Sequence, residues 1–333
     1  MKFLTLKRKL ANRLWGEFVS FTRTKSYYQK IYSAYWHYRF SSRNQVSDHL
    51  NYYAATPNRG AGIGHQMANW IAGYWFARQF GLQFAHTTFA SEKWEQFLGF
   101  GVDETSVEDL IKQGYKKVKL PLFDEFNAAE IALNKSIIAS YGNQRVVFVA
   151  EQDQGYQDQF GVMGDLQRKF NNAPARKSDA LIYAKENFNI AIHVRRGDIV
   201  IGQANKNPNL LMRWQDNSYF EQVLATVVSG LKQEKPIAIY LFSQGESSEF
   251  VMFEKFENLH FCLAMGAQDS FLHMVNADLL ISSKSSFSYK PALLSKGLKV
   301  APRNFWHGYP KTKDWILVED NGLFDTTQLN TKQ

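Results

Sequence analysis

Two adjacent arginines and an aspartate follow an apolar stretch in the second half of the chain. In the segment NIAIHVRRGDIV, the residues whose side chains could bind a ligand or take part in a reaction are His193, Arg195, Arg196 and Asp198. An unpaired buried charge is very costly, so adjacent arginines in an apolar context need an anion. A guanidinium holds a phosphate through two parallel N–H bonds, which a lysine cannot provide. The segment predicts an anion site, and the alternative is an inter-domain salt bridge in which Asp198 neutralises one arginine.

The alternation of side chains along a strand predicts how this segment is arranged. His193 and Arg195 are two residues apart, so they are expected to face the same side. Arg196 is expected to point the opposite way unless the turn at Gly197 redirects it. Ligands of open parallel sheets bind beyond the carboxyl ends of the strands, so the segment is expected to face a binding cleft.

A serine cluster is the second candidate for anion binding. In SSKSSFSYK, the hydroxyl groups fill the turn between a predicted strand, DLLIS, and the helix that follows. Serine hydroxyls and the N–H groups of a helix N-terminus form a ready anion site. Ordinary helix capping would also account for these serines. Because the arginines lie in the same half of the chain, we predict that the two clusters together hold a pyrophosphate.

A glycine-rich loop, RGAGIGHQ, precedes the first long amphipathic helix. The spacing of Gly60, Gly62 and Gly64 differs from the dinucleotide-binding fingerprint, and no Gly-Lys-Ser/Thr follows as in a P-loop. The glycines would let a ligand approach the backbone closely. His65 is a candidate acid–base group, because imidazole titrates near neutral pH, and helix capping is the alternative role.

The elements that must position these clusters follow an α/β pattern. Predicted helices and strands succeed one another in LQFAH, VEDLIKQGY, RVVFVAE, NIAIHV, SYFEQVLATVVSGLKQE, PIAIYLFS, DSFLHMVNA, DLLISS, YKPALLSKG and KVAP. This succession predicts doubly wound parallel sheets. We expect a basic, amphipathic helical segment at 1–45, a Rossmann-like acceptor domain at 46–178 and a Rossmann-like nucleotide-binding domain at 179–333, facing each other across a cleft.

The first 43 residues carry the excess positive charge of the chain. The net charge is +8, and this segment holds ten Lys or Arg residues against one acid, Glu17. Apolar residues recur there at helical spacing, at Leu6, Leu10, Leu14, Phe18 and Phe21, among many aromatic residues. Such a helix suits an anionic membrane surface or a docking partner. Packing on the main body and nucleic-acid binding are the alternatives, and nucleic acid is the one we expect least.

Cysteine content and hydropathy exclude several classes of protein. The single cysteine, Cys262, excludes a disulfide framework and a cysteine-based metal site. Charge interrupts the opening residues before a signal-peptide core can form, and no run of about 18 apolar residues occurs. We therefore expect a cytoplasmic protein that lies peripherally at the inner face of the plasma membrane.

The three clusters, in this order, resemble motifs of the inverting fucosyltransferase superfamily, which includes the α1,2-fucosyltransferases and the enzymes that make α1,6-linked and O-linked fucose. GIGHQ (62–66) is similar to the family's glycine-rich motif, and HVRRGD (193–198) to its H-x-R-R-x-D motif. DSFLHMVNADLLISSKSSFS (269–288) is similar to its aspartate-led helix, strand and S-S-F-S. His65 replaces the family's usual Asn, and SYKPALLSKG replaces the tryptophan-rich stretch of the α1,2 branch.

The resemblance implies a GT-B fold and a metal-independent, inverting transfer of fucose from GDP-fucose in polysaccharide biosynthesis. It implies that Arg195 holds the pyrophosphate, that His193 and Asp269 contact guanine or ribose, and that Arg196 and Asp198 support this frame. The full expected donor-binding set is His193, Arg195, Arg196, Asp269, Ser285, Ser286, Phe287, Gly62 and Gly64. No metal site is expected.

Catalysis would need a charge-stabilising group and a base. Arg195 would stabilise the charge of the departing GDP. The base that activates the acceptor hydroxyl is expected to be His65 or Asp198, with Glu92 and Glu95 as further candidates. The expected partners are a GDP-sugar, a glycan or lipid-linked saccharide acceptor and an anionic membrane, without nucleic acid. The rival hypotheses are transfer of another GDP-sugar and a non-catalytic nucleotide- or glycan-binding protein.

Overall fold

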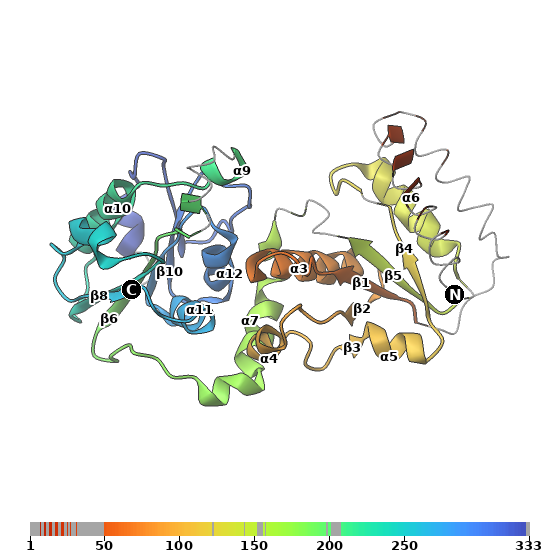
Figure 1. The fold of residues 1–333 in the computed structure, drawn as a ribbon, viewed down its shortest axis with the longest axis horizontal. Helices are drawn as coiled ribbons and strands as arrows, with labels where there is room; N and C mark the ends of the chain where they lie inside the picture. Colours follow the sequence, from red (N-terminus) through yellow and green to blue (C-terminus); the bar gives the residue numbers. More distant parts are fainter. Residues whose placement is uncertain are drawn as a thin grey trace.

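The computed structural model of the chain contains two parallel β-sheets flanked by helices (Figure 1). It describes residues 50–330 except 122, 143, 152–155, 157, 198 and 201–207, together with residues 7, 10, 13, 14, 17, 18, 21, 22, 25, 27 and 31. The predicted α/β class with two Rossmann-like units is confirmed. Most of the predicted segment 1–45 lies outside the described residues. Among the residues described, no helix is long and apolar enough to cross a membrane.

The first sheet has the strand order β3-β2-β1-β5-β4, and each neighbouring pair is parallel. Its strands are β1 (Tyr52–Thr56), β2 (Gln83–His86), β3 (Thr105–Ser106), β4 (Lys116–Lys119) and β5 (Val146–Glu151). Its helices are α3 (Ile63–Gln79), α4 (Glu92–Leu98), α5 (Val107–Lys112) and α6 (Ala128–Ala139). The central strands β1 and β5 are almost wholly apolar, because helices cover both faces of a parallel sheet.

The second sheet has the strand order β11-β10-β9-β6-β7-β8, again with parallel neighbours. Its strands are β6 (Phe188–His193), β7 (Ile237–Phe242), β8 (Leu259–Cys262), β9 (Leu279–Ile281), β10 (Leu298–Pro302) and β11 (Trp315–Val318). Its helical elements are α9 (Pro208–Leu211), α10 (Asn217–Gly230), η3 (Ser247–Phe253), α11 (Ala267–Asn276), α12 (Ser286–Leu294) and η4 (Thr326–Asn330). The chain builds outward from β6 to β8 and then returns to the other side of β6 with β9. The crevice between β6 and β9 is therefore the topological switch point of this sheet.

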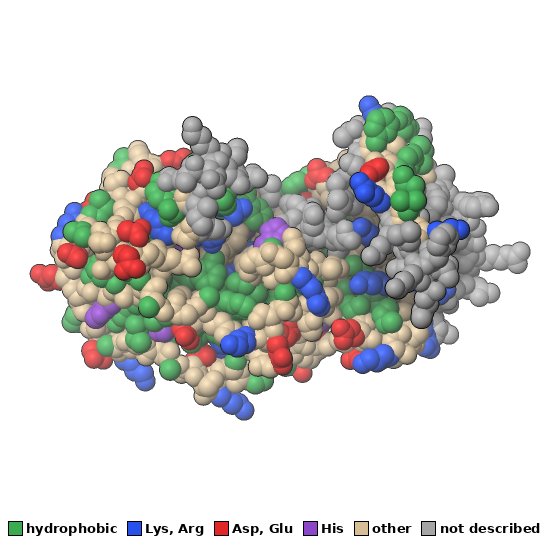
Figure 2. Space-filling model, viewed as in Figure 1, with side chains coloured by type: hydrophobic (Ala, Val, Ile, Leu, Met, Phe, Trp, Pro, Cys, Tyr) green, Lys and Arg blue, Asp and Glu red, His purple; other side chains and the backbone are tan. Residues whose placement is uncertain are grey.

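The connection between the sheets passes through η1 (Gln159–Val162), α7 (Met163–Asn172) and η2 (Pro174–Ser178). Residue 178, where we predict the first domain to end, is the last residue of η2. Helix α7 lies against α12 of the second unit, and the Nε2 of Gln167 donates to the carbonyl of Leu293 at 3.0 Å. The outline of the molecule is indented between the two lobes (Figure 2).

One buried apolar cluster runs through both units. It includes Trp70 and Phe76 of α3 as well as Phe271 of α11 and Tyr289 of α12. Aromatic rings of α4 take part in the junction: the Phe97 and Phe271 ring centroids lie 5.8 Å apart. Two smaller clusters fill the outer faces of the second and first sheets. The two lobes in Figure 1 thus share one continuous interior.

The helix that follows the serine cluster begins earlier than the sequence suggests. We place its predicted start at Tyr289, whereas α12 begins at Ser286. Ser285 is the N-cap, and its Oγ accepts a hydrogen bond from the N–H of Phe287 at 3.2 Å. The predicted turn therefore supplies the first helical turn itself, which is a common use of serine at a helix start.

Candidate functional site

The arginine and serine clusters meet at the switch point of the second sheet. His193 is the last residue of β6, and Ser283 follows β9, the neighbouring strand. The His193 Nδ1 and the Ser283 Oγ are 2.9 Å apart. Parallel strands end at the same edge of a sheet, so two motifs 90 residues apart in sequence come together where such folds bind ligands.

Arg195 points toward the N-terminus of α12. Its Nη1 donates to the Oγ of Ser285, the N-cap of that helix, at 3.3 Å. Arg195 is half-buried, and the first turn of α12 contains no acidic residue. The positive end of the helix and a guanidinium therefore converge on one point, which is the arrangement that favours an anion.

A pocket of about 600 Å³ opens beside this point. It is lined by His193, Val194, Arg195, Arg196, Gly197, Phe242, Ser243, Gln244, Met265, Ala267, Ser270 and Phe287. The wall formed by Phe242, Met265 and Phe287 is apolar, and the arginine edge is cationic. The pocket thus offers one surface to a flat or apolar group and another to an anion.

His193 contributes a neutral imidazole to this pocket. Burial, together with the charges of Arg195 and Arg196, lowers the pKa of His193 to about 3. The side chain is 7% exposed. At neutral pH, His193 is therefore a hydrogen-bonding group with no charge.

Arg196 bonds a different set of groups from Arg195. Its Nη1 donates to the carbonyls of Arg195, at 2.7 Å, and Gln215, at 3.2 Å, and its Nη2 bonds the Oδ1 of Asn217. The guanidinium carbon lies 4.3 Å from the ring centroid of Trp214. Burial lowers the pKa of Arg196, and the charges of Asp216 and Glu249 oppose this shift.

Through these contacts, Arg196 holds the loop that follows β6 in place. Gly197 comes next with φ +70°, and a Cβ there would lie 2.1 Å from the Oε1 of Gln244. Only glycine fits such a left-handed position against a neighbour this close. The loop that presents Arg195 is therefore held on one side by Arg196 and on the other by the segment after β7.

The serine loop contacts the glycine-rich loop of the first unit. A Cβ on Gly64 would lie 2.8 Å from the carbonyl carbon of Ser286 and 3.0 Å from the nitrogen of Phe287. The close approach that Gly64 permits is thus made by another helix of the chain. Gly62 is the N-cap of α3, is exposed, and has nothing within 4 Å of its Cβ position.

Phe287 and Ser286 complete the loop. The Phe287 ring centroid is 5.6 Å from that of His193 and 5.9 Å from that of Phe271. The Ser286 Oγ lies 3.2 Å from the Nε2 of His307, a residue that follows β10. The predicted residues His193, Arg195, Ser285, Ser286 and Phe287 are therefore in one place.

Asp269 lies apart from these residues. It is exposed in the first turn of α11. It lines a separate pocket of about 300 Å³ at the junction of the two units, together with Phe97 and Arg176. Asp269 does not line the pocket that contains Arg195 and Arg196.

The candidate bases have distinct environments. His65 is half-buried in the first turn of α3, next to Gly64, and Glu92 is exposed on α4. Asp198 lies outside the described residues. Glu95, by contrast, is held by two hydrogen bonds, from the Nε2 of His86 at 2.7 Å and from the N–H of Phe89 at 2.9 Å.

These bonds tie Glu95 into a buried network. Burial alone would raise the pKa of Glu95, but the hydrogen bond and charge of His86 and the Phe89 amide lower it. The Nδ1 of His86 accepts from the Nε1 of Trp70 at 2.9 Å. Both ring nitrogens of His86 and both oxygens of Glu95 are thus engaged, which favours a structural role for this pair over a catalytic one.

Sequence reasoning missed several residues of the site. Ser243 and Gln244 follow β7, and the segment 303–307 follows β10, so both lie at the carboxyl edge of the sheet. The polar SQG after PIAIYLF and the aromatic RNFWH after KVAP were the available signals. Met265 and Ala267 come from the turn before α11 and carry no recognisable pattern.

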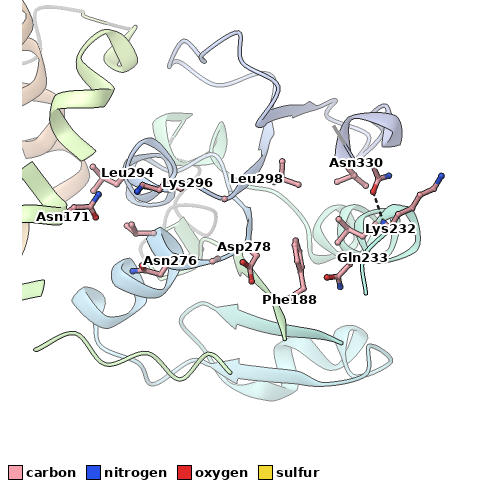
Figure 3. Close-up of a pocket in the computed structure, with 15 residues that line it drawn as sticks. Asn171, Phe188, Lys232, Gln233, Asn276, Asp278, Leu294, Lys296, Leu298 and Asn330 are labelled. Atoms are coloured by element: carbon pink, nitrogen blue, oxygen red, sulfur yellow. Dashed lines mark hydrogen bonds between the residues drawn. The ribbon is translucent and has the colours of Figure 1, made fainter. Parts of the chain in front are cut away.

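A third pocket, of about 500 Å³, lies at the amino-terminal edge of the second sheet, opposite the site (Figure 3). Asp278 and Asn330 line it. The Asp278 Oδ2 accepts from the N–H of Asn189 at 2.8 Å, and the Asn330 Oδ1 accepts from that of Lys232 at 2.8 Å. Asp278 thus secures the amino end of β6, away from the edge where parallel sheets bind ligands.

Within the described part of the chain, no three His, Cys, Asp or Glu side chains are grouped so that they could hold a metal ion. No family model matches the sequence, and no curated protein matches it significantly.

Several solved structures are similar to this chain. NodZ alpha-1,6-fucosyltransferase soaked with GDP-fucose is 12% identical, with a TM-score of 0.45 over 74% of this chain and 93% of that chain. POFUT1 in complex with GDP is 11% identical, with a TM-score of 0.44 over 76% and 98%. A mutant of Arabidopsis thaliana FUT1 in complex with GDP is 9% identical, with a TM-score of 0.44 over 90% and 79%. At these identities the similarity concerns the fold alone.

Proposed function

We propose that this protein is a metal-independent, inverting glycosyltransferase that transfers fucose from GDP-fucose to a hydroxyl of a glycan. One observation carries the proposal. At the switch point of the second sheet, Arg195 and the N-terminus of α12 meet across Ser285 beside an open pocket. A diphosphate suits the cationic edge of this pocket, and a nucleobase suits its apolar wall.

The proposed chemistry uses the fixed positive charges of the site. The diphosphate gains negative charge as the bond between the sugar and GDP breaks. Arg195 and the N–H groups at the start of α12 are already in place, so they stabilise this charge more strongly in the transition state than in the ground state. In this proposal these groups supply the charge that a divalent cation supplies elsewhere, and activity should persist in EDTA.

His65 is the base that we propose for the acceptor hydroxyl. It follows Gly64, the residue of the first unit that contacts the serine loop. Imidazole is a side chain that commonly acts as a general base in enzymes. Among the other candidates, Glu95 is held in the network with His86.

The test combines binding with turnover. We expect GDP to bind the wild type, and we expect GDP-fucose to be hydrolysed fastest in a panel of GDP-sugars. Arg195→Ala should weaken GDP binding by about 10- to 100-fold and abolish hydrolysis, and Arg195→Lys should restore binding only in part, because lysine lacks the bidentate fork. Faster hydrolysis of a different GDP-sugar would reassign the donor. GDP binding without turnover of any donor or acceptor would instead indicate a non-catalytic nucleotide-binding protein.

The acceptor that we propose is a lipid-linked saccharide at the inner face of the plasma membrane. Leu10, Leu14, Phe18 and Phe21 recur on one helical stripe and are between 42% and 70% exposed. A helix packed on the main body would bury such a stripe. The surrounding lysines and arginines would attract anionic lipid while the stripe enters the interface.

Vesicle binding tests this part of the proposal. The double variant Leu14→Glu, Phe18→Glu should lose co-sedimentation with phosphatidylserine-containing vesicles and keep donor hydrolysis. Vesicles of phosphatidylcholine alone should bind the wild type weakly. Equal binding of variant and wild type to anionic vesicles would refute the membrane role and leave the transferase proposal intact.

A further inference from the structure

His307 is a buried histidine that packs behind the serine loop. It follows β10 and is 4% exposed. Its ring stacks on Tyr289 of α12, with centroids 3.9 Å apart and an interplanar angle of 8°. The Trp306 ring covers it at 3.6 Å. The Tyr289 hydroxyl donates to the carbonyl of Gly308 at 2.7 Å, so this segment and the first turns of α12 are fastened together.

The polar contact of this ring is with the serine loop. The His307 Nε2 lies 3.2 Å from the Ser286 Oγ, in the first turn of α12. The neighbouring residue, Ser285, receives the hydrogen bond from Arg195. Arg195 thus contacts the N-cap residue of α12, and the imidazole of His307 contacts the hydroxyl of the next residue, Ser286.

The direction of the hydrogen bond follows from the environment of the ring. Burial lowers the pKa of His307 well below its usual range, and the charges of Lys290 and Arg213 act in the same direction, so the ring is neutral and carries one N–H. The Nδ1 is buried without a hydrogen-bond partner among the described residues. A proton on Nδ1 would be a buried, unsatisfied donor, whereas a proton on Nε2 is used on Ser286.

A donating Nε2 determines what the Ser286 hydroxyl can do. The oxygen accepts from His307, so its own proton is left for another acceptor. An anion at the N-terminus of α12 is such an acceptor, and a hydrogen bond to a charged oxygen is stronger than one between neutral groups.

We propose that His307 is a positioning residue that holds the Ser286 hydroxyl so that its proton points at the diphosphate of the bound nucleotide. This inference rests on the proposed function, because it assumes a diphosphate at the serine loop. His307 touches neither the nucleotide nor the sugar in this proposal. It acts through Ser286, and the stacking on Tyr289 and Trp306 fixes its orientation in advance of binding.

The experiment measures GDP and guanosine binding to the full chain by calorimetry. His307→Phe keeps a flat ring in the stack and removes both nitrogens. Ser286→Ala removes the hydroxyl. We expect each to weaken GDP binding about tenfold, the loss of one charge-assisted hydrogen bond, and to leave guanosine binding unchanged. In the double variant the loss should stay near tenfold, because the two residues act as one unit.

Two further variants separate positioning from general stability. His307→Gln retains an N–H donor and should recover part of the affinity for GDP. Ile316→Ala removes buried carbon from β11 in the same unit. It should lower stability as a large-to-small core change does and leave GDP affinity unchanged. His307→Gln also serves as the test if His307→Phe does not fold.

The outcomes are distinguishable from those of the proposed function. Equal losses of GDP and guanosine affinity in His307→Phe, or losses that add in the double variant, would overturn the inference. GDP binding that depends on Arg195 but not on His307 or Ser286 would overturn the inference alone. Failure of the wild type to bind GDP would overturn the proposed function, and the inference with it.

Discussion

Gly64 of the first unit and Ser286 of the second are in backbone contact, since a Cβ on Gly64 would lie 2.8 Å from the Ser286 carbonyl carbon. The first turns of α3 and α12 therefore meet at the loop that we assign to the diphosphate. A residue of one unit fixes the position of a binding loop in the other. The geometry of the donor site thus depends on how the two units are packed.

Gly64→Ala is expected to displace this loop. The atoms that the new methyl group meets belong to the backbone and cannot rotate away, so overpacking should lower the free energy of unfolding by about 1–3 kcal/mol. The rate of GDP-fucose hydrolysis should fall at least tenfold, because small displacements of positioned groups are costly for catalysis. Hydrolysis assays and urea unfolding measure the two effects.

Gly62→Ala is the matched control for this change. It adds the same methyl group two residues earlier, where nothing lies within 4 Å and φ is −63°. Its activity and stability should remain close to wild type. Similar losses in both variants would show that the loop, rather than the contact with α12, is responsible.

The two adjacent arginines are expected to respond differently to substitution. Arg195 is half-buried and faces the pocket, so Arg195→Ala should weaken GDP binding by about 10- to 100-fold with little change in stability. Arg196 is 4% exposed and bonds backbone carbonyls and Asn217. Arg196→Ala should therefore lower the free energy of unfolding by about 2–4 kcal/mol. Calorimetry with GDP and urea unfolding would separate the two losses, and the reverse pattern would contradict this assignment.

His193 should make the protein more sensitive to acid. Its pKa is about 3 in the folded protein and about 6.5 in an unfolded chain. Below pH 6.5 the unfolded chain takes up a proton that the folded protein does not. Stability from the neutral ring is therefore complete above pH 6.5 and is lost as the pH falls toward 3, at about 1.4 kcal/mol per pH unit.

His193→Gln should remove this contribution to the slope. Urea unfolding at several pH values between 7.5 and 4.5 would measure it. Parallel slopes in wild type and His193→Gln would contradict the expectation.

Glu95 is expected to matter for stability rather than for the chemical step. Glu95→Ala would leave the Nε2 of buried His86 without its carboxylate, which should cost about 1–3 kcal/mol of unfolding free energy. The exposed Glu92 on the same helix is the comparison, and Glu92→Ala should cost less than about 0.5 kcal/mol. A folded, stable Glu95→Ala protein that had lost only turnover would restore Glu95 as a candidate base.

Part of this structure could be predicted because it depends on short-range patterns. The apolar runs of β6, β7 and β9 and the spacing along α3 indicated a parallel α/β sheet. The HVRRGD and SSKSSFS segments lie at the carboxyl ends of two strands. Because the carboxyl ends of parallel strands lie at the same edge of a sheet, the two segments were expected to lie close together. Strand alternation predicted that Arg195 and Arg196 point in different directions, and the two side chains do bond different partners.

The remaining features depend on partners that no local pattern specifies. Strand β4, with sequence KKVK, lies at the edge of its sheet and contains a single apolar residue, so it lacks a strong apolar signal. The bond between Trp70 and His86 joins α3 to β2 across the core. His307 and Ser286 are 21 residues apart and meet because the segment after β10 packs against the first turns of α12. Such contacts become visible only once the sheets are assembled.

The aromatic junction formed by Phe97 and Phe271 has a consequence for the chain as a whole. Because the interior is continuous from one lobe to the other, heat should melt both lobes in a single cooperative transition. Either lobe expressed by itself would expose apolar surface to water and tend to aggregate. Neither lobe is therefore expected to fold stably without the other. A chimera with one lobe from a distant protein would require repacking of this aromatic junction.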